Sequence, residues 1–387
     1  MIVDSHAYCF PAPDTRAGHA TAEAHLAFWQ WAHASHHQPA FRIRDRAASD
    51  ARVLLDPMAP PPLHLADRAF RVDPGRTRMI WTVDGEDHTK HFLPPNTIDY
   101  SPAQLVTAMD DAGVDWALLH VDATLSRDVE YQAAAVRSYP DRLRSMASID
   151  EWRIADEPDV VIRQATDAIE VHGLHALKII PTYAYVLHGD RGFDTPGWRP
   201  FWDAVTRLGV PFFFTLGARP GSTDPLTGFL DEVWTLARWL DRYPDVRASI
   251  THGFPWRELL VGDRIEIPAA FWEPFRDRPG LSLEVSFPVR IGDRLDHPWR
   301  GCLPGLEAMV EHVGADRLLW GTDMPFQDRF CTYRQSREWI ERDATFLDRA
   351  QLAAIMGGTA ARILGIRAPG GQPTGGSNRA GQPTGAR

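Results

Sequence analysis

Met1-Ile-Val-Asp-Ser-His-Ala-Tyr8 opens the chain, and a late apolar segment ends in Leu318-Leu-Trp-Gly-Thr-Asp323. Both stretches have the apolar character of buried strands and end in polar side chains, which is typical of parallel strands in a barrel. The first and last strands of a closed barrel are neighbours. His6 and Asp323 are therefore expected side by side at the carboxyl-terminal rim, where barrel enzymes place their chemistry.

Short apolar runs alternate with amphipathic helical stretches after residue 100. Besides 2–6, strands are expected at 116–121, 144–148, 176–180, 211–215, 247–252, 281–286 and 318–321. One helix should begin at Ser101-Pro-Ala-Gln104, a capping box with proline at the first helical position. Eight strands, each followed by a helix-length segment, predict an α/β fold, the (β/α)8 TIM barrel. A doubly wound open sheet is the alternative, but no glycine-rich phosphate loop follows the first strand.

Residues 1–366 are expected to form one barrel, with 9–100 as a long insertion after strand one. This insertion is far longer than an ordinary strand-to-helix loop. It contains a helical stretch at 21–37 and a hairpin signal around Asp84-Gly85. It would lie over the barrel mouth as a lid or as a dimer contact, so a homodimer is expected. Residues 367–387 repeat Gly-Gln-Pro-Thr-Gly and are expected to be disordered.

The composition excludes several classes of partner. A net charge of −10 argues against a nucleic-acid surface, which needs clustered Lys and Arg. No apolar run approaches the roughly 20 residues that span a bilayer. The three cysteines and the absence of a leader before the first strand predict a cytoplasmic protein. A small-molecule substrate is the expected partner, with no organic cofactor.

Polar side chains gather near the predicted carboxyl ends of the strands. They are Asp4, His6, Tyr8, His120, Asp122, Lys178, Thr215, His252, Glu284 and Asp323. Such groups converging on one rim would make a catalytic constellation, although each alone is more often structural. Lys178 is harder to explain as structural, because a lysine among apolar strand residues is costly to bury unless it is paired.

The chain resembles the amidohydrolase-related group that includes aminocarboxymuconate-semialdehyde decarboxylase and the resorcylate decarboxylases. The resemblance spans roughly residues 1–11 and 99–366. It is carried by Ile2-Val-Asp-Ser-His-Ala-Tyr-Cys-Phe-Pro11, Tyr139-Pro-Asp-Arg-Leu143, Ala176-Leu-Lys-Ile-Ile-Pro181, Thr251-His-Gly253, Leu319-Trp-Gly-Thr-Asp-Met-Pro325 and Met356-Gly-Gly-Thr-Ala-Ala-Arg-Ile-Leu-Gly365.

The resemblance implies one divalent metal, zinc or manganese. The metal is held by a pair of ligands on strand one, a histidine on strand five and an aspartate on strand eight. A strand-six histidine acts on the substrate or on metal-bound water. His6, His252 and Asp323 match this pattern, whereas Tyr8 and Thr215 stand where two histidines are expected. Neutral tyrosine and threonine are poor ligands for zinc.

Two outcomes are left open for the metal. Either Glu284, His120 or Asp122 completes a displaced site, or the metal is weak or absent. Without a metal, His252 and Asp323 would act with His6 as an acid–base group, and Tyr8 would donate a hydrogen bond to a developing oxyanion.

The expected function is an amidohydrolase-type enzyme that decarboxylates or hydrolyses a small carboxylated, cyclic or aromatic substrate. The expected catalytic residues are His252, Asp323, Lys178 and Tyr8, the substrate-binding residues Thr215, His120 and Trp256, and the metal ligands His6, Asp323 and Glu284. The alternatives are a metal-independent lyase, hydratase or cyclase, and a non-catalytic ligand-binding barrel.

Overall fold

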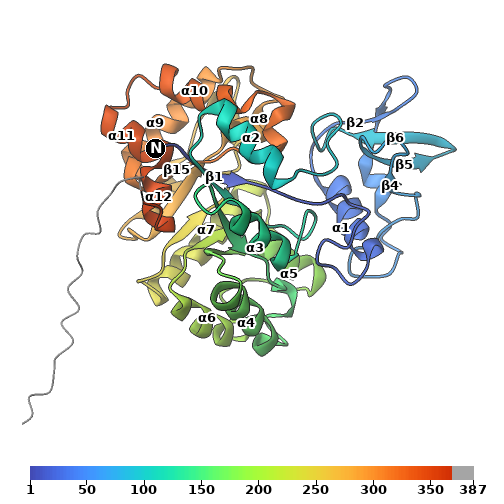
Figure 1. The fold of residues 1–387 in the computed structure, drawn as a ribbon, viewed down its shortest axis with the longest axis horizontal. Helices are drawn as coiled ribbons and strands as arrows, with labels where there is room; N and C mark the ends of the chain where they lie inside the picture. The colour runs from blue at the N-terminus through green and yellow to red at the C-terminus, as the bar shows by residue number, and fades with distance from the viewer. Residues whose placement is uncertain (368–387) are drawn as a thin grey trace, which may run out of the picture.

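Eight parallel strands curl into a nearly closed barrel in the computed structural model, which describes residues 1–367 (Figure 1). In spatial order they are β1 (Val3–Ala7), β7 (Trp116–Leu119), β8 (Leu143–Ala147), β9 (Ala176–Ile179), β10 (Phe212–Phe214), β11 (Ala248–Ile250), β14 (Leu281–Val285) and β15 (Leu318–Trp320). The first and last strands are joined beyond their ends, where Tyr8 N–H donates to Met324 O at 2.8 Å and Asp323 N–H to His6 O at 2.8 Å. The predicted (β/α)8 barrel is confirmed. The expected tail lies, apart from Arg367, outside the described residues.

Helices surround the barrel. They are α2 (Pro102–Ala112), α3 (Val129–Ser138), α4 (Pro158–Thr166), α5 (Pro181–Leu187), α6 (Arg199–Val205), α7 (Pro225–Arg242), α8 (Phe287–Ile291), α9 (Leu303–His312), α10 (Tyr333–Asp343), α11 (Arg349–Ala353) and α12 (Thr359–Leu364). The predicted capping box is present, because Ser101 Oγ accepts from Gln104 N–H while the Gln104 side chain accepts from Ser101 N–H. No helix among residues 1–367 is long and apolar enough to cross a bilayer.

The alternation of strands and helices is interrupted once. Residues 252–280 form no α-helix; they contain the short antiparallel pair β12 (Leu260–Val261) and β13 (Arg264–Ile265) and two 3-10 turns. The expectation that every strand is followed by a helix was therefore wrong at this point. Pro255, Pro268 and Pro274 account for it, because proline lacks the amide hydrogen and clashes within a helix interior.

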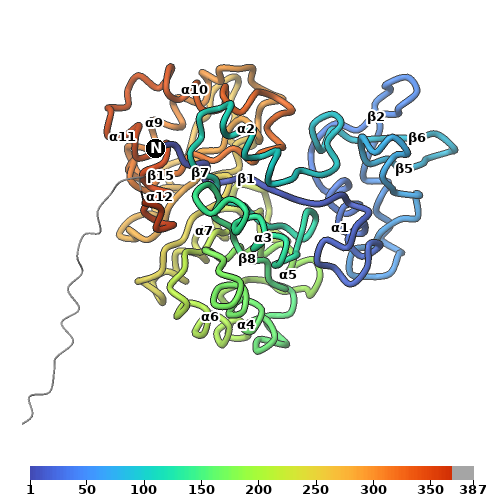
Figure 2. Tube along the Cα trace, in the orientation of Figure 1, coloured from blue at the N-terminus to red at the C-terminus, as the bar shows by residue number. Residues whose placement is uncertain are grey.

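The insertion after β1 builds a separate lobe beside the barrel (Figures 1 and 2). It contains α1 (Ala22–Ser35) and an antiparallel sheet of β3 (Ala48–Ser49), β2 (Ala40–Arg42), β6 (Glu86–Lys90), β5 (Met79–Val83) and β4 (Arg71–Val72), in that order. The predicted hairpin is present, with β5 and β6 paired on either side of Asp84-Gly85. The lobe lies on the side towards which the arrow of β1 points, so it sits at the carboxyl-terminal end of the strands.

The lobe has an apolar core that it shares with the barrel rim. Trp29, Trp81 and Phe92 of the insertion are buried in one cluster with Tyr8 and Phe326 of the barrel. Edge-to-face contacts link Trp29 to Phe92 and Phe92 to Phe326, with Phe92 and Phe326 centroids 5.5 Å apart. The aromatic contacts fix the lobe over the rim.

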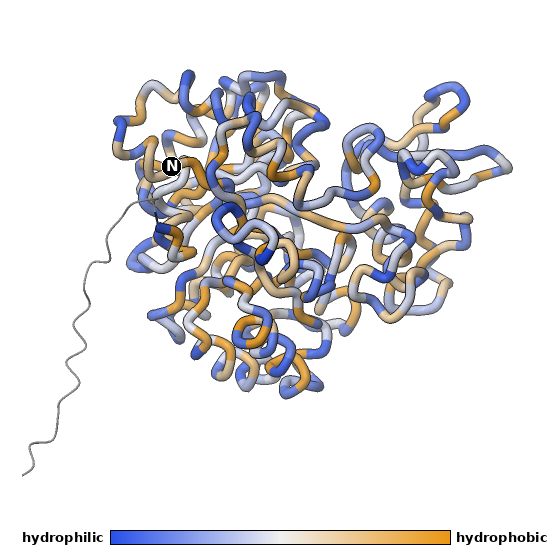
Figure 3. The backbone as a smooth tube through the Cα atoms, in the orientation of Figure 1, coloured by the Kyte–Doolittle hydropathy of each residue, from blue (hydrophilic) through white to orange (hydrophobic). Residues whose placement is uncertain are grey.

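Inside the barrel, strand alternation decides which side chains face inward. On β10, Phe213 packs in the barrel interior, whereas Phe212 and Phe214 pack outward against the helices. On β9, Leu177 and Ile179 belong to the outer layer, so Lys178 points inward. Figure 3 shows hydrophobic and hydrophilic stretches alternating along the chain, and the residues of β9 and β10 are all buried. A charged lysine in this apolar setting requires a polar partner.

Candidate active site

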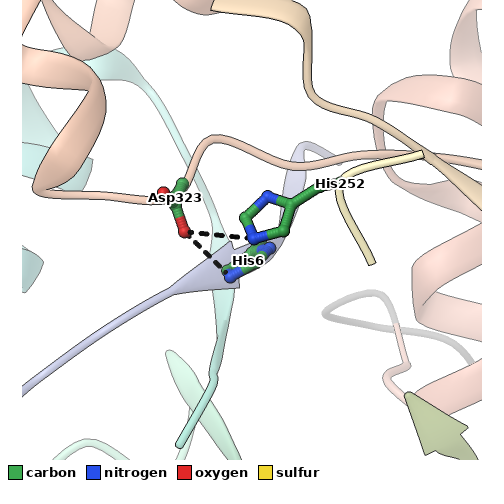
Figure 4. Close-up of side chains that lie close together, drawn as sticks. All are labelled: His6, His252 and Asp323. Atoms are coloured by element: carbon green, nitrogen blue, oxygen red, sulfur yellow. Dashed lines mark ion pairs between the residues drawn. The ribbon is translucent and has the colours of Figure 1, made fainter. Parts of the chain in front are cut away.

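His6, His252 and Asp323 form a compact group at the rim (Figure 4). His6 lies in β1, His252 follows β11 by two residues, and Asp323 follows β15 by three. Asp323 Oδ1 is 3.0 Å from His6 Nε2 and 4.0 Å from His252 Nε2. One carboxylate oxygen therefore faces two imidazoles. The three side chains come from the ends of three separate strands.

The backbone at two of these residues is strained. His252 has φ of 65° and Asp323 has φ of 66°, in the left-handed region that non-glycine residues rarely adopt. Such conformations cost on the order of 1–3 kcal/mol each and persist where surrounding contacts impose them. Here the His252 N–H donates to the Glu284 carboxylate, and the Asp323 N–H donates to His6 O. Strain of this kind gathers at functional sites, which supports a functional role for the group.

Carboxylates contact both nitrogens of the His6 ring. His6 Nδ1 is 2.9 Å from Glu284 Oε2, and Nε2 is 3.0 Å from both Asp323 Oδ1 and the Tyr8 hydroxyl. Burial by itself lowers the pKa of His6, but the Coulomb attraction of Glu284 and Asp323 outweighs it and the pKa is raised. Gly321 makes room for this arrangement, because a Cβ there would lie 2.5 Å from Glu284 Oε1.

Glu284 and Asp323 lie at opposite nitrogens of the His6 ring. These two carboxylates therefore cannot join His6 in one ligand set. The described residues instead offer two potential metal-binding groups, namely His6, His252 and Asp323, and His6, His120 and Glu284. Glu284 fits better as the residue that orients His6, since metal-bound histidines commonly donate their second N–H to a carboxylate.

The group of His6, His252 and Asp323 fits a divalent metal. It supplies three protein donors, the number that a catalytic zinc usually keeps. With Nδ1 of His6 engaged by Glu284, the Nε2 atom is left facing Asp323. The Thr215 hydroxyl is buried without a hydrogen-bond partner among residues 1–367, and it lines the same cavity.

Lys178 and His120 are buried beneath this group. Lys178 Nζ is 2.6 Å from His120 Nδ1, and His120 Nε2 is 2.8 Å from the Ser5 carbonyl oxygen. Because the Ser5 carbonyl oxygen can only accept a hydrogen bond, the proton of the His120 ring lies on Nε2. The Nδ1 atom therefore accepts a hydrogen bond from Lys178. The His120 ring stacks on His6 with centroids 3.6 Å apart. The pair thus packs against His6 from below, and the contact of His120 with substrate stays a prediction.

Lys178 should make stability depend on pH. Burial lowers its pKa from 10.5 to about 8. The unfolded chain therefore binds the proton more tightly, and the contribution of Lys178 to stability rises as pH increases from about 8 to 10.5. Relative to Lys178→Met, wild type should gain roughly 1–3 kcal/mol across this window. Urea denaturation of both proteins at pH 7.5 and 10 measures the difference; parallel pH dependences would contradict it.

Asp4 has a structural position. Its carboxylate accepts from Tyr333 Oη at 2.6 Å, from Thr322 and from the His6 N–H at 2.9 Å, and so ties β1 to the segment after β15. Burial raises its pKa to about 7 although these hydrogen bonds oppose the shift. It is fully buried and does not line the cavity described next.

A cavity of about 130 Å³ lies between the barrel rim and the insertion. Its lining includes Tyr8, Thr215, His252 and Asp323 from the barrel and His36, His37, Gln38 and Phe92 from the insertion. For comparison, a cavity of roughly 150 Å³ holds one benzene molecule. The cavity is thus of a size suited to a small ring.

Two residues expected at the site lie outside the lining of this cavity. Trp256 is fully buried outside the lining; its Nε1–H donates to His252 O at 2.7 Å, so it positions the His252 loop. Lys178 lines only a small inner cavity, together with Asp122, Glu151 and Tyr183. The roles predicted for both side chains stay predictions.

Two arginines at the cavity were missed from the sequence. Arg290 lies in α8, and Arg329 lies in the 3-10 turn Phe326–Arg329 after β15. They lie well beyond the ends of their strands, in a chain with 41 Lys and Arg, so their sequence positions carry no signal. Asp122, which was noted at a strand end, also lines the cavity and accepts from Tyr183 Oη at 2.6 Å.

Comparisons with known proteins agree with the fold. The protein family described as Amidohydrolase matches residues 22–366. The solved 2,6-dihydroxybenzoate decarboxylase from Rhizobium is 18% identical, with a TM-score of 0.50, over 70% of this chain and 90% of that one. A probable 2-pyrone-4,6-dicarboxylic acid hydrolase from Acinetobacter baumannii is 17% identical, with a TM-score of 0.50, over 70% of this chain and 91% of that one. At this identity the two structures show a shared fold.

Proposed function

The chain belongs to the amidohydrolase family, and from this premise we propose that it is an enzyme that decarboxylates a small aromatic or cyclic carboxylic acid. The observation that carries the proposal is the Asp323 carboxylate, which faces His6 and His252 at a ring-sized cavity. The names of the two solved structures supply the reaction classes. Hydrolysis of a cyclic ester at the same site is the second reaction to test.

Decarboxylation breaks the bond between the ring and the carboxylate carbon, and the electron pair stays on the ring carbon, which must take up a proton. His252 and Asp323 would relay that proton from solvent to the ring carbon. Burial lowers the pKa of His252 well below its usual value, and neighbouring His6 lowers it further, so the ring is neutral and able to accept a proton. A positioned acid or base of this kind contributes about 10²–10⁴ in rate.

Tyr8 would bind a substrate oxygen that gains negative charge. Burial raises the pKa of Tyr8 well above its usual value, so the hydroxyl keeps its proton and remains a donor. It lies in the cavity lining beside His252 and Asp323. A preorganised donor aimed at developing charge lowers the barrier for the chemical step.

A divalent metal, when bound, would act as a Lewis acid on a substrate oxygen. His6 and Asp323 would hold it, and His252 lies close enough to complete the group. A metal-independent lyase is the second candidate. It is favoured by one observation: the His6 ring lies between two carboxylates at 2.9 and 3.0 Å, so its imidazolium offsets one of their two negative charges without a metal.

The activity test incubates the protein with hydroxybenzoic acids and benzene dicarboxylic acids, with and without MnCl₂, and follows CO₂ release and the product by chromatography. His252→Ala should lose activity, whereas His172→Ala, a histidine outside the cavity, should not. Failure of wild type to consume any of these acids would argue against decarboxylation. A carboxylated 2-pyrone, which is a cyclic ester, is assayed beside these acids, and its ring opening without CO₂ release would favour the hydrolase.

Restoring two imidazoles should strengthen metal binding. The double variant Tyr8→His with Thr215→His should raise the affinity for zinc or manganese by roughly tenfold or more, because imidazole replaces hydroxyls that bind zinc poorly. Calorimetric titration and elemental analysis measure the change, with the exposed Thr227→His as control. Unchanged affinity in the double variant would mean that these side chains do not reach the ligand group.

A further inference from the structure

Two guanidinium groups at the cavity lack a carboxylate partner. Arg290 and Arg329 both line it together with His252 and Asp323. Among residues 1–367, no carboxylate oxygen lies within 4.0 Å of either guanidinium. Arginine stays protonated in proteins, and a partly buried charge without a partner is costly. An anionic ligand would remove that cost.

Two acidic side chains near the arginines are already engaged by other groups. Asp293, three residues after Arg290, is held by Arg257 at 2.6 Å. Asp323 faces His6 and His252. Both arginines are thereby left available to a ligand rather than to the protein.

The Arg329 side chain is held in place by two carbonyls. Its Nε–H donates to Phe326 O at 2.8 Å and one Nη to His91 O at 3.2 Å. Its second Nη is left without a hydrogen-bond partner among the described residues, as is the whole guanidinium of Arg290. A planar guanidinium with free donors is suited to binding a carboxylate through two parallel hydrogen bonds.

The remaining walls are neutral or apolar. His36 and His37 of the insertion face the arginines, and burial lowers their pKa values to about 4 and about 3, so both rings are neutral near pH 7. Phe92, Phe326 and Val289 form the apolar part. A ring with an anionic substituent matches this combination of surfaces.

We propose that Arg290 and Arg329 bind a second carboxylate of the substrate, one that the reaction leaves in place. The substrate would then be an aromatic or cyclic dicarboxylic acid. This inference rests on the proposed decarboxylase function.

The reaction itself argues that the clamped carboxylate is not the one lost. The departing group becomes neutral CO₂ as its bonding electron pair moves to the ring carbon, which takes a proton from the His252 and Asp323 side. An ion pair to that group would stabilise the bound substrate more than the transition state and would slow the step. An ion pair to a retained carboxylate holds the ring in place throughout.

The test is equilibrium binding of two unreactive or slowly reacting probes, benzoate and isophthalate, to the purified full-length protein by calorimetry. Wild type should bind isophthalate about tenfold or more tightly than benzoate, because the second carboxylate gains charge-assisted hydrogen bonds. Arg290→Gln and Arg329→Gln should each remove most of this preference. Arg294→Gln, an exposed neighbour, should keep the preference.

Arg290→Lys and Arg329→Lys provide a second measurement if the glutamine variants fail to fold. They keep the charge but lose the planar fork, and should retain part of the preference. Equal binding of both probes to wild type, or a preference that survives both substitutions, would overturn the proposal. A preference that depends on the arginines, without turnover of any acid, would leave the carboxylate clamp standing while the proposed decarboxylation fails.

Discussion

Asp323→Ala is expected to lower kcat/KM by about 10³-fold on the acid identified in the activity screen. The reason is geometric: Asp323 Oδ1 is the atom that His6 and His252 both face, at 3.0 and 4.0 Å. Removing it takes away an expected metal ligand if the enzyme binds a metal, and one member of the acid–base pair if it does not. Steady-state kinetics with and without added manganese measure the loss in both forms.

Asp323→Asn separates charge from shape. It keeps the side-chain volume and the strained backbone but removes the negative charge, so it should lose nearly as much activity as alanine. Asp296→Ala, on an exposed segment, is the matched control and should behave as wild type. Activity of Asp323→Asn within threefold of wild type would show that the charge plays no part in the reaction.

Glu284→Ala is expected to lower the free energy of unfolding by about 3 kcal/mol or more, the usual cost of removing one partner of a buried charged pair. The carboxylate is 1% exposed and makes three contacts: with His6 Nδ1, with the His252 N–H, and with Ser5 Oγ at 3.1 Å. Without it the His6 ring loses the charge that orients it, and the His252 amide loses its acceptor. Denaturation in urea measures the change.

The exposed Glu258→Ala is the control for this variant and should change stability by less than about 0.5 kcal/mol. Glu284→Gln keeps an oxygen acceptor for the His252 amide and should fall between wild type and alanine. Should Glu284→Ala unfold at the same urea concentration as wild type, the carboxylate would not be the residue that holds these two histidines.

The barrel and its first and last strands could be predicted because their signals are local. An apolar run ending in polar residues indicates a buried strand wherever it lies in the chain, and Ser101 with Gln104 marks a helix start through bonds within one turn. The hairpin at Asp84-Gly85 is equally local. The prolines in residues 252–280 also indicate locally that no α-helix forms there, although the spacing of the strands alone led us to expect one.

The prediction that His6, His252 and Asp323 lie together required one further inference, namely that the barrel is closed. Once the eight strands are parallel, their carboxyl ends meet at one rim, and residues at those ends must approach each other. Which of the polar side chains reach the cavity was decided by the tertiary structure alone. Lys178 and His120 point inward as alternation requires, but the stacking of His120 on His6 places them beneath the site.

The sequence by itself determined the barrel, the insertion after its first strand and the set of polar residues at the rim, because these follow from short-range periodicity and from the order of the strands. Only the tertiary structure decided the cavity. Its walls come from the insertion, α8 and the turn after β15, segments far apart in the chain that meet through aromatic packing. The positions of Arg290 and Arg329 follow from that packing, and no local pattern encodes it.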